Sequence, residues 1–74
     1  MKFNLQPGHD YIQLNQLLKL LGLVESGGEA NRVITDGEVM VNNLPETQKR
    51  KKLRIGDVVL WDSHEISIVA EEDD

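Results

Sequence analysis

The sequence has no cysteine and only two histidines, His9 and His64. Without cysteine the chain has no disulfide framework, no thiolate zinc site and no cysteine nucleophile. Two imidazoles are too few for a histidine-rich metal site, so we expect no metal and no cofactor. Carboxylates are plentiful, yet no predicted element places two of them beside a pocket, so we expect no enzyme of the acid–base type.

Long apolar segments are also missing. The longest uninterrupted one, Val58–Trp61, is far shorter than the roughly 20 residues that a membrane-spanning helix needs. Residues 1–5 contain one lysine, but no apolar segment of the secretory type follows them. We therefore expect the protein in the cytoplasm.

The length of 74 residues allows one small domain. Domains below roughly 80 residues lie near the lower limit of a self-sufficient hydrophobic core, which excludes a two-domain enzyme with a cleft between its halves. We predict a single domain over residues 1–70, followed by an acidic disordered tail at residues 71–74.

The charge of the chain is strongly polarised. Thirteen acidic and eight basic residues give a net charge of −5, but four of the acidic residues are residues 71–74, and the rest of the chain is nearly neutral. Five of the basic residues lie within residues 49–54, which we call the basic segment: Lys49, Arg50, Lys51, Lys52 and Arg54. Because local potential steers a charged partner, the acidic total does not argue against nucleic acid.

A first helix is predicted over residues 11–21. The spacing i, i+3, i+4, i+7 places four residues on one helical face: Leu14, Leu17, Leu18 and Leu21. Asp10 is suited to cap the amino end of this helix, and Gly22 lies where a left-handed residue would close it.

A second helix, near ten residues long, is predicted after Ser26. Serine followed by Glu29 has the spacing of a capping box, and Gly37 ends the pattern. Its apolar stripe consists of Ala30, Val33 and Ile34. Gly27 and Gly28 would each weaken the first turn by roughly 1 kcal/mol relative to alanine, so something other than helix propensity favours glycine there.

The remaining segments have the period of strands. Val39 and Val41 alternate with polar residues, and Asn42-Asn43 is a turn pair that tolerates positive φ, so a tight hairpin is expected. Further strands are predicted at Lys2–Leu5, at Val58–Trp61, and over the alternating residues Ile66, Ile68 and Ala70, with a turn at residues 62–64 between the last two. The fold class is therefore α+β, with two helices packed on one face of a small antiparallel sheet.

Four segments in this order resemble a known module: Leu17-Leu18-Lys19-Leu20-Leu21-Gly22-Leu23; Ser26 with Ala30 and Ile34; Gly37-Glu38-Val39-Met40-Val41-Asn42-Asn43; and Gly56-Asp57-Val58-Val59. They resemble the RNA-binding domain of ribosomal small-subunit protein S-four, the αL motif. The resemblance covers residues 12–60, and the chain looks like the small bacterial stand-alone proteins of this type. It implies the same two helices on a small antiparallel sheet.

The resemblance also implies an RNA-facing surface at the start of the second helix, the hairpin and the following loop. By position, its residues are Ser26, Gly27 and Gly28 at the helix start, Arg32 along the helix, Asn42 and Asn43 in the turn, and Thr47, Lys49, Arg50 and Lys52 in the loop. Arg54 belongs to the same basic segment. Gly27 and Asn31 stand where larger relatives usually have arginine, and Asn43 stands where glycine is usual.

Two hypotheses of function follow. Lysine and arginine contacts to phosphate supply most of the affinity for nucleic acid. Only Tyr11 lies near the basic features as a base-stacking group, while Phe3 and Trp61 are expected in the core, so structured RNA, ribosomal or transfer, is favoured over single strands. The alternative is a protein-interaction adaptor that has lost strong RNA binding, in which the basic segment is an ordinary solvated loop.

Overall fold

The computed structural model describes residues 1–70, so the predicted tail at residues 71–74 lies outside the described residues. Two helices and seven strands follow one another in the order β1 (Lys2–Leu5), β2 (Ile12–Gln13), α1 (Leu14–Leu20), α2 (Gly27–Thr35), β3 (Met40–Val41), β4 (Leu44–Pro45), β5 (Lys52–Leu53), β6 (Val58–Trp61) and β7 (His64–Ala70). Of the helices in residues 1–70, none combines the length and the apolar composition that a bilayer-spanning segment requires.

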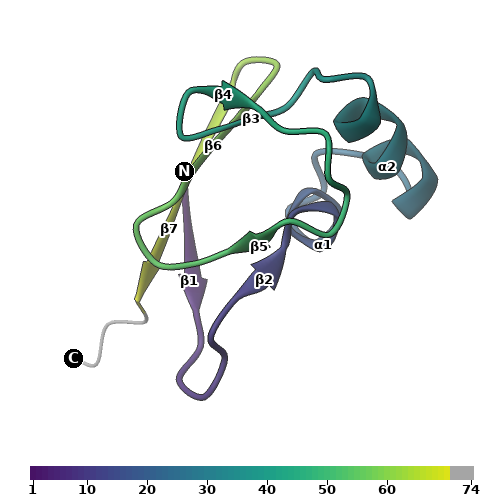
Figure 1. Ribbon diagram of the computed structural model, residues 1–74. Helices are drawn as coiled ribbons and strands as arrows, with labels where there is room; N and C mark the ends of the chain where they lie inside the picture. The colour runs from purple at the N-terminus through teal and green to yellow at the C-terminus, as the bar shows by residue number, and fades with distance from the viewer. Residues whose placement is uncertain (71–74) are drawn as a thin grey trace.

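Five strands form the main sheet, in the order β1-β7-β6-β3-β4, and β2 pairs separately with β5. The two helices lie together on one side of this sheet (Figure 1). The predicted α+β class is confirmed, with one difference: β1 pairs parallel to β7, so the sheet is mixed rather than wholly antiparallel. The alternation of apolar residues specifies which face of a strand is buried, but it does not specify the direction of the neighbouring strand. His64, expected in a turn, is the first residue of β7.

The first helix is shorter than predicted, because β2 occupies its expected first turn. Residues 12 and 13 pair with β5, the helix begins at Leu14, and Asp10 is not its cap. The predicted end is confirmed: Gly22 has a φ of 71° and donates its amide hydrogen bond to the carbonyl of Lys19, as in a Schellman motif.

The second helix agrees with the prediction. The Oγ atom of Ser26 accepts a hydrogen bond of 3.1 Å from the amide of Glu29, which satisfies one of the free groups of the first turn. Gly37, with a φ of 76°, follows the helix and closes it. The bounds of this helix therefore follow from local capping chemistry.

The core lies between the helices and the sheet. Its largest fully buried side chains come from the helices and from the strands with their adjoining segments: Leu14, Leu17, Leu18, Val33, Ile34, Val39, Leu53, Val59, Ile66 and Ile68. Phe3 and Trp61 pack against this core and are only partly buried. Within residues 1–70 no polar or charged side chain is buried, so the core consists of apolar side chains alone.

Leu53 connects the basic segment to this core, which generates a stability prediction. Its exposed fraction is 0%, whereas that of Ile55, two residues further on, is 60%. We expect Leu53→Ala to lower the free energy of unfolding by about 2–5 kcal/mol, because a buried leucine leaves a cavity. Ile55→Ala is the matched control and should change it by less than about 0.5 kcal/mol. Urea unfolding followed by circular dichroism measures both, and equal losses would contradict the assignment of Leu53 to the core.

Candidate nucleic-acid interface

The backbone of the basic segment is fixed to the start of α1. The amide of Leu14 donates a hydrogen bond of 2.9 Å to the carbonyl of Lys51, and the amide of Asn15 donates one of 3.1 Å to the carbonyl of Lys49. These are amides of the first helical turn, which have no partner inside the helix. Gln13, at the cap position, provides no side-chain bond. The basic segment therefore caps α1 through its carbonyls, which leaves its side chains free.

Because side chains alternate along β5, Lys52 and Arg54 project away from the core. In the β2–β5 pair, Ile12 lies opposite Leu53, and both side chains are buried. Because neighbouring side chains alternate between the two faces, Lys52 and Arg54 lie on the other face of this pair, together with Tyr11. The Nζ atom of Lys52 lies 4.9 Å from the centre of the Tyr11 ring, and the Cζ atom of Arg54 lies 6.0 Å from it. Two cation–π contacts thus group the aromatic ring with the basic segment.

The end of the basic segment is tied to the β3–β4 hairpin by Asp57. One carboxylate oxygen of Asp57 accepts a hydrogen bond of 2.8 Å from the amide of Arg54, and the other accepts one of 3.0 Å from the side-chain amide of Asn42. The side-chain oxygen of Asn42 in turn accepts a bond of 2.9 Å from the amide of Val58. These hydrogen bonds fix the position of the hairpin turn relative to the basic segment.

The hairpin turn is confirmed, and its two asparagines have different surroundings. Asn42 and Asn43 have φ values of 52° and 69°, the pattern of a type I′ turn. Both residues are exposed, but the side chain of Asn42 is hydrogen-bonded within the protein to Asp57 and Val58. Asn42 therefore has fewer free hydrogen-bonding groups to offer a ligand.

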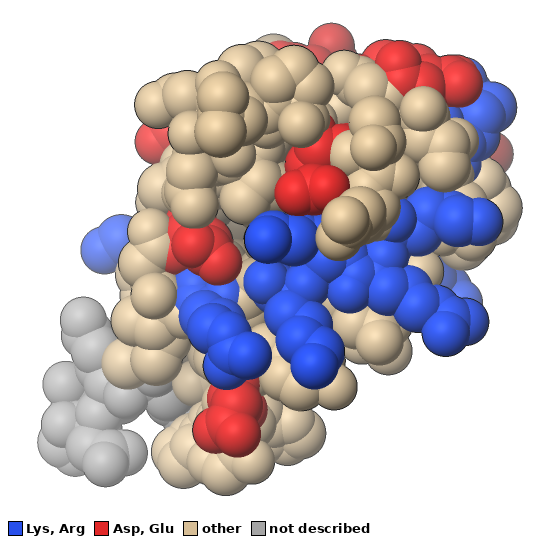
Figure 2. Space-filling view, viewed as in Figure 1, with Lys and Arg blue, Asp and Glu red and all other residues tan. Residues whose placement is uncertain are grey.

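The basic segment forms a positive surface. The side chains of Lys49, Arg50, Lys52 and Arg54 are exposed, and Lys51 is half-buried. Figure 2 shows lysine and arginine side chains gathered in a band across one face, with acidic side chains beside it. In residues 1–70 the ion pairs within 4.0 Å all involve Arg32, so the cations of the basic segment have no carboxylate partner among the described residues.

The start of α2 contains two glycines that its own fold does not require. Neither Gly27 nor Gly28 has a positive φ. A Cβ atom at Gly27 would meet nothing within 4 Å, and one at Gly28 would lie 3.8 Å from the Oγ atom of Ser26. The backbone here is open to an approaching group.

One side of α2 contacts Asn15, the α1 residue whose amide is bonded to the basic segment. The side-chain amide of Asn15 donates a hydrogen bond of 3.3 Å to the side-chain oxygen of Asn31. Gly27 and Gly28 precede Asn31 by four and three residues, and such positions lie on one side of a helix. The two glycines therefore lie on the side of α2 that carries Asn31, the residue through which α2 contacts Asn15.

Arg32 differs from the other predicted contacts. Its guanidinium lies 3.5 Å from a carboxylate oxygen of Asp36 and 3.8 Å from one of Glu38, so its charge is shared with two acidic groups. It also lies about 100° around the helix from Asn31. Thr47 is exposed and lies two residues before the basic segment in the sequence.

The contacts that hold this surface together were not predictable from the sequence. Nothing in the residue pattern indicated that Asn15 connects α1 to Asn31 and to the basic segment, because these contacts join distant parts of the chain. The sequence identified Asp57 only as the second residue of a glycine–aspartate pair and did not indicate its hydrogen bonds. Among the described residues no group of three or more histidine, aspartate or glutamate side chains is arranged to hold a metal ion.

Comparison with known proteins agrees with this arrangement. A family model described as the S4 domain matches residues 5–69, which is most of the chain. The chain belongs to the S4 domain family. The resemblance inferred from the leucine–glycine segment, the hairpin and the glycine–aspartate pair is thereby confirmed.

Two bacterial relatives are similar over most of their length. YbcJ of Escherichia coli is 40% identical over 62 residues, which cover 84% of this chain and 89% of YbcJ. RlbA of Bacillus subtilis, named a probable ribosome maturation protein, is 42% identical over 50 residues, which cover 68% of this chain and 70% of RlbA. The solution structure of YbcJ, described as revealing an αL motif involved in RNA binding, superposes with a TM-score of 0.71 at 39% identity and covers 93% of this chain and 86% of that chain.

The different surroundings of the two asparagines lead to a second prediction. Asn42→Gly keeps a residue suited to positive φ but removes both side-chain hydrogen bonds, so we expect it to lower the free energy of unfolding by about 1–2 kcal/mol. Asn43→Gly also suits positive φ and removes an exposed side chain, so stability should be unchanged or slightly higher. Parallel urea titrations compare them. If Asn42→Gly were as stable as Asn43→Gly, the network around Asp57 would not stabilise the hairpin.

Proposed function

We propose that this S4 domain protein is a non-catalytic RNA-binding protein that acts in the cytoplasm. The observation that carries the proposal is the basic segment, in which four exposed cations project from a backbone held by α1, β2 and Asp57. Because the backbone of these cations is already held, phosphate binding has to order only their side chains. The relatives support it, since YbcJ is described as containing an αL motif involved in RNA binding.

The proposed contacts fall into two groups. Lys49, Arg50, Lys52 and Arg54 bind phosphates directly, with Asn43 and Thr47 at the edge of the same surface. Ser26, Gly27 and Gly28 offer a second phosphate position at the start of α2, where free amides and a partial positive charge favour an anion. Arg32 and Asn42 contribute less, because their side chains are already engaged within the protein.

The proposed ligand is structured RNA, with ribosomal RNA tested before transfer RNA. Recognition by phosphate contacts reads the shape of the RNA backbone rather than a run of stacked bases. The single aromatic ring grouped with the cations, Tyr11, agrees with this mode. RlbA, named a probable ribosome maturation protein, makes ribosomal RNA the first ligand to test.

Salt-titrated binding to a ribosomal RNA hairpin tests the proposal. We expect Lys49→Gln/Lys52→Gln to weaken binding at low salt and to make the slope of log affinity against log salt shallower by about 1.4–1.8, because two phosphate contacts are lost at roughly 0.7–0.9 each. The matched control is Lys2→Gln/Lys19→Gln, which removes the same charge from two other exposed lysines. The control should keep the original slope.

Two results would contradict the proposal. An equal loss of RNA affinity in both double variants would mean that overall charge, not the basic segment, attracts RNA. No binding by the unaltered protein even at low salt would favour the protein-interaction adaptor instead, and a search for a protein partner would follow.

The glycines of α2 give a separate test. Gly27→Ala and Gly28→Ala should raise the melting temperature, since alanine stabilises a helix by up to about 1 kcal/mol relative to glycine and nothing nearby obstructs the added methyl group. The same substitutions should weaken RNA binding if a phosphate approaches this backbone closely. Thermal unfolding and RNA titration are measured on the same samples. Higher stability with unchanged RNA affinity would remove the start of α2 from the interface.

A further inference from the structure

A hollow lies at the turn between β6 and β7. It has a volume of about 350 Å³, and residues 60–65 form most of its lining. Glu38, which precedes β3, and Met40 of β3 complete it. β6 begins next to Asp57, which holds the basic segment, and runs from there toward this hollow. We call it the Trp61 hollow.

Three neighbouring strands contribute one row of side chains to this hollow. Met40 in β3 lies opposite Leu60 in β6, and Leu60 lies opposite Glu65 in β7. Directly opposite residues share one face of a sheet, so two half-buried apolar side chains lead to an exposed acidic residue. Trp61 is half-buried and also lines the hollow, and its ring stacks with the imidazole of His64 at a centroid distance of 6.2 Å.

The rim of the Trp61 hollow is negatively charged. Its lining includes the exposed acidic residues Glu38, Asp62 and Glu65, and no lysine or arginine. The carboxylate of Glu38 lies 3.8 Å from the guanidinium of Arg32, so its charge is shared. The terminal ammonium group of Met1 donates its hydrogen bond to the main-chain carbonyl of Glu65, not to the carboxylate. Within residues 1–70, Asp62 and Glu65 therefore have no basic partner within 4.0 Å.

The charges of this rim suit an organic cation better than a metal ion. Among the described residues no three acidic or histidine side chains are arranged to hold a metal. An apolar wall that ends at a carboxylate instead matches a side chain with an apolar stem and a charged head. Arginine and lysine have this form.

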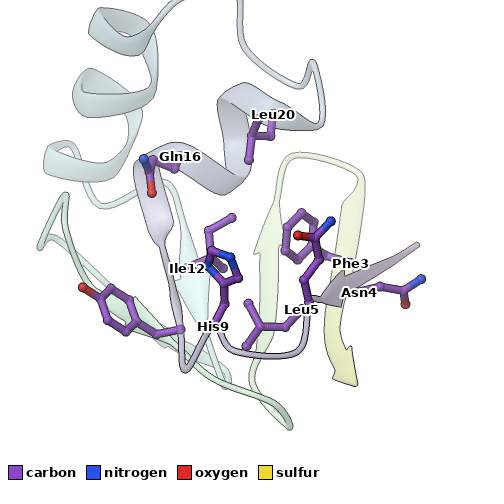
Figure 3. Close-up of a pocket in the computed structure, with 9 residues that line it drawn as sticks. Phe3, Asn4, Leu5, His9, Ile12, Gln16 and Leu20 are labelled. Atoms are coloured by element: carbon purple, nitrogen blue, oxygen red, sulfur yellow. The ribbon is translucent and has the colours of Figure 1, made fainter. Parts of the chain in front are cut away.

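The larger hollow between β1 and α1 differs in its chemistry. It has a volume of about 460 Å³, and Figure 3 shows Leu20 on α1 and Phe3 on β1 on opposite sides of it. No lysine, arginine, aspartate or glutamate belongs to its lining. It therefore has no charge that would select one kind of partner, whereas the Trp61 hollow has.

We infer that the Trp61 hollow binds an arginine-rich segment of a partner protein. The stem of one arginine lies along Met40 and Leu60, and its guanidinium binds the carboxylates of Asp62 and Glu65. Arginine is preferred to lysine, because its planar guanidinium can bond to a carboxylate at two points and is more weakly hydrated. The basic segment has the opposite charge and lies beyond the other end of β6, so the partner protein and RNA can be bound together.

Trp61 is the single tryptophan of the chain, so its fluorescence reports directly on this hollow. The probe is a short peptide of alternating arginine and glycine. A second peptide contains citrulline, which keeps the shape of arginine without its charge, at each arginine position. We expect the arginine peptide to change the Trp61 emission until saturation and the citrulline peptide to leave it unchanged. Calorimetry on the same samples measures the affinity.

Matched variants assign the binding to the rim of the hollow. Asp62→Asn/Glu65→Gln should weaken the arginine peptide roughly tenfold, since each exposed contact of a carboxylate with a guanidinium contributes a factor of about two to five. Asparagine tolerates the φ of 55° at position 62, so the turn is kept. The control is Asp10→Asn/Glu25→Gln, which removes the same charge from two exposed residues outside the hollow and should keep the affinity.

Each outcome decides the inference without reference to RNA. A loss of affinity in Asp62→Asn/Glu65→Gln that the control does not share would establish the site. An equal loss in both double variants would overturn it, because the net charge of the chain would then attract the peptide. Equal affinity for the two peptides, calorimetric binding without a change in the Trp61 emission, or no binding by the unaltered protein would overturn it as well.

Discussion

The hydrogen bonds between the first turn of α1 and the basic segment are the constraint on which the candidate interface depends. The amides of Leu14 and Asn15 need acceptors, and the carbonyls of Lys51 and Lys49 supply them. A side-chain cap would have satisfied the helix without organising anything else. A backbone cap instead fixes a second segment and leaves its side chains free. The backbone that carries the cations is therefore ordered during folding, before any ligand arrives.

Two further features place the cations of the basic segment on the surface and join the segment to the hairpin. Leu53 lies in the core, so its neighbours Lys52 and Arg54 must project outward. Asp57 then holds the amide of Arg54 and the side chain of Asn42, which joins the segment to the hairpin. A chain with a net charge of −5 can thus present a positive surface, because a phosphate responds to the potential nearby rather than to the sum over the molecule.

Elements defined by contacts of a few residues were predictable from the sequence, and those defined by distant contacts were not. The second helix was predicted closely, because Ser26 and Gly37 define its ends through contacts of a few residues. The type I′ hairpin followed from two adjacent asparagines in the same way. The predicted start of α1 was wrong, because β2 pairs with β5 where the first turn and the cap at Asp10 were expected. Within the site, the exposure of the four cations was predictable, while the internal bonds of Asn42 were not.

The sequence by itself determined the α+β class, the family, the position of the hairpin and the cluster of positive charge, because periodicity, capping residues, turn residues and composition act locally. Only the tertiary structure decided that β1 runs parallel to β7, that the basic segment caps α1, and that the ring of Tyr11 lies against Lys52 and Arg54. Each of these joins residues far apart in the chain. Their contacts depend on how the elements pack against one shared core, which no local pattern records.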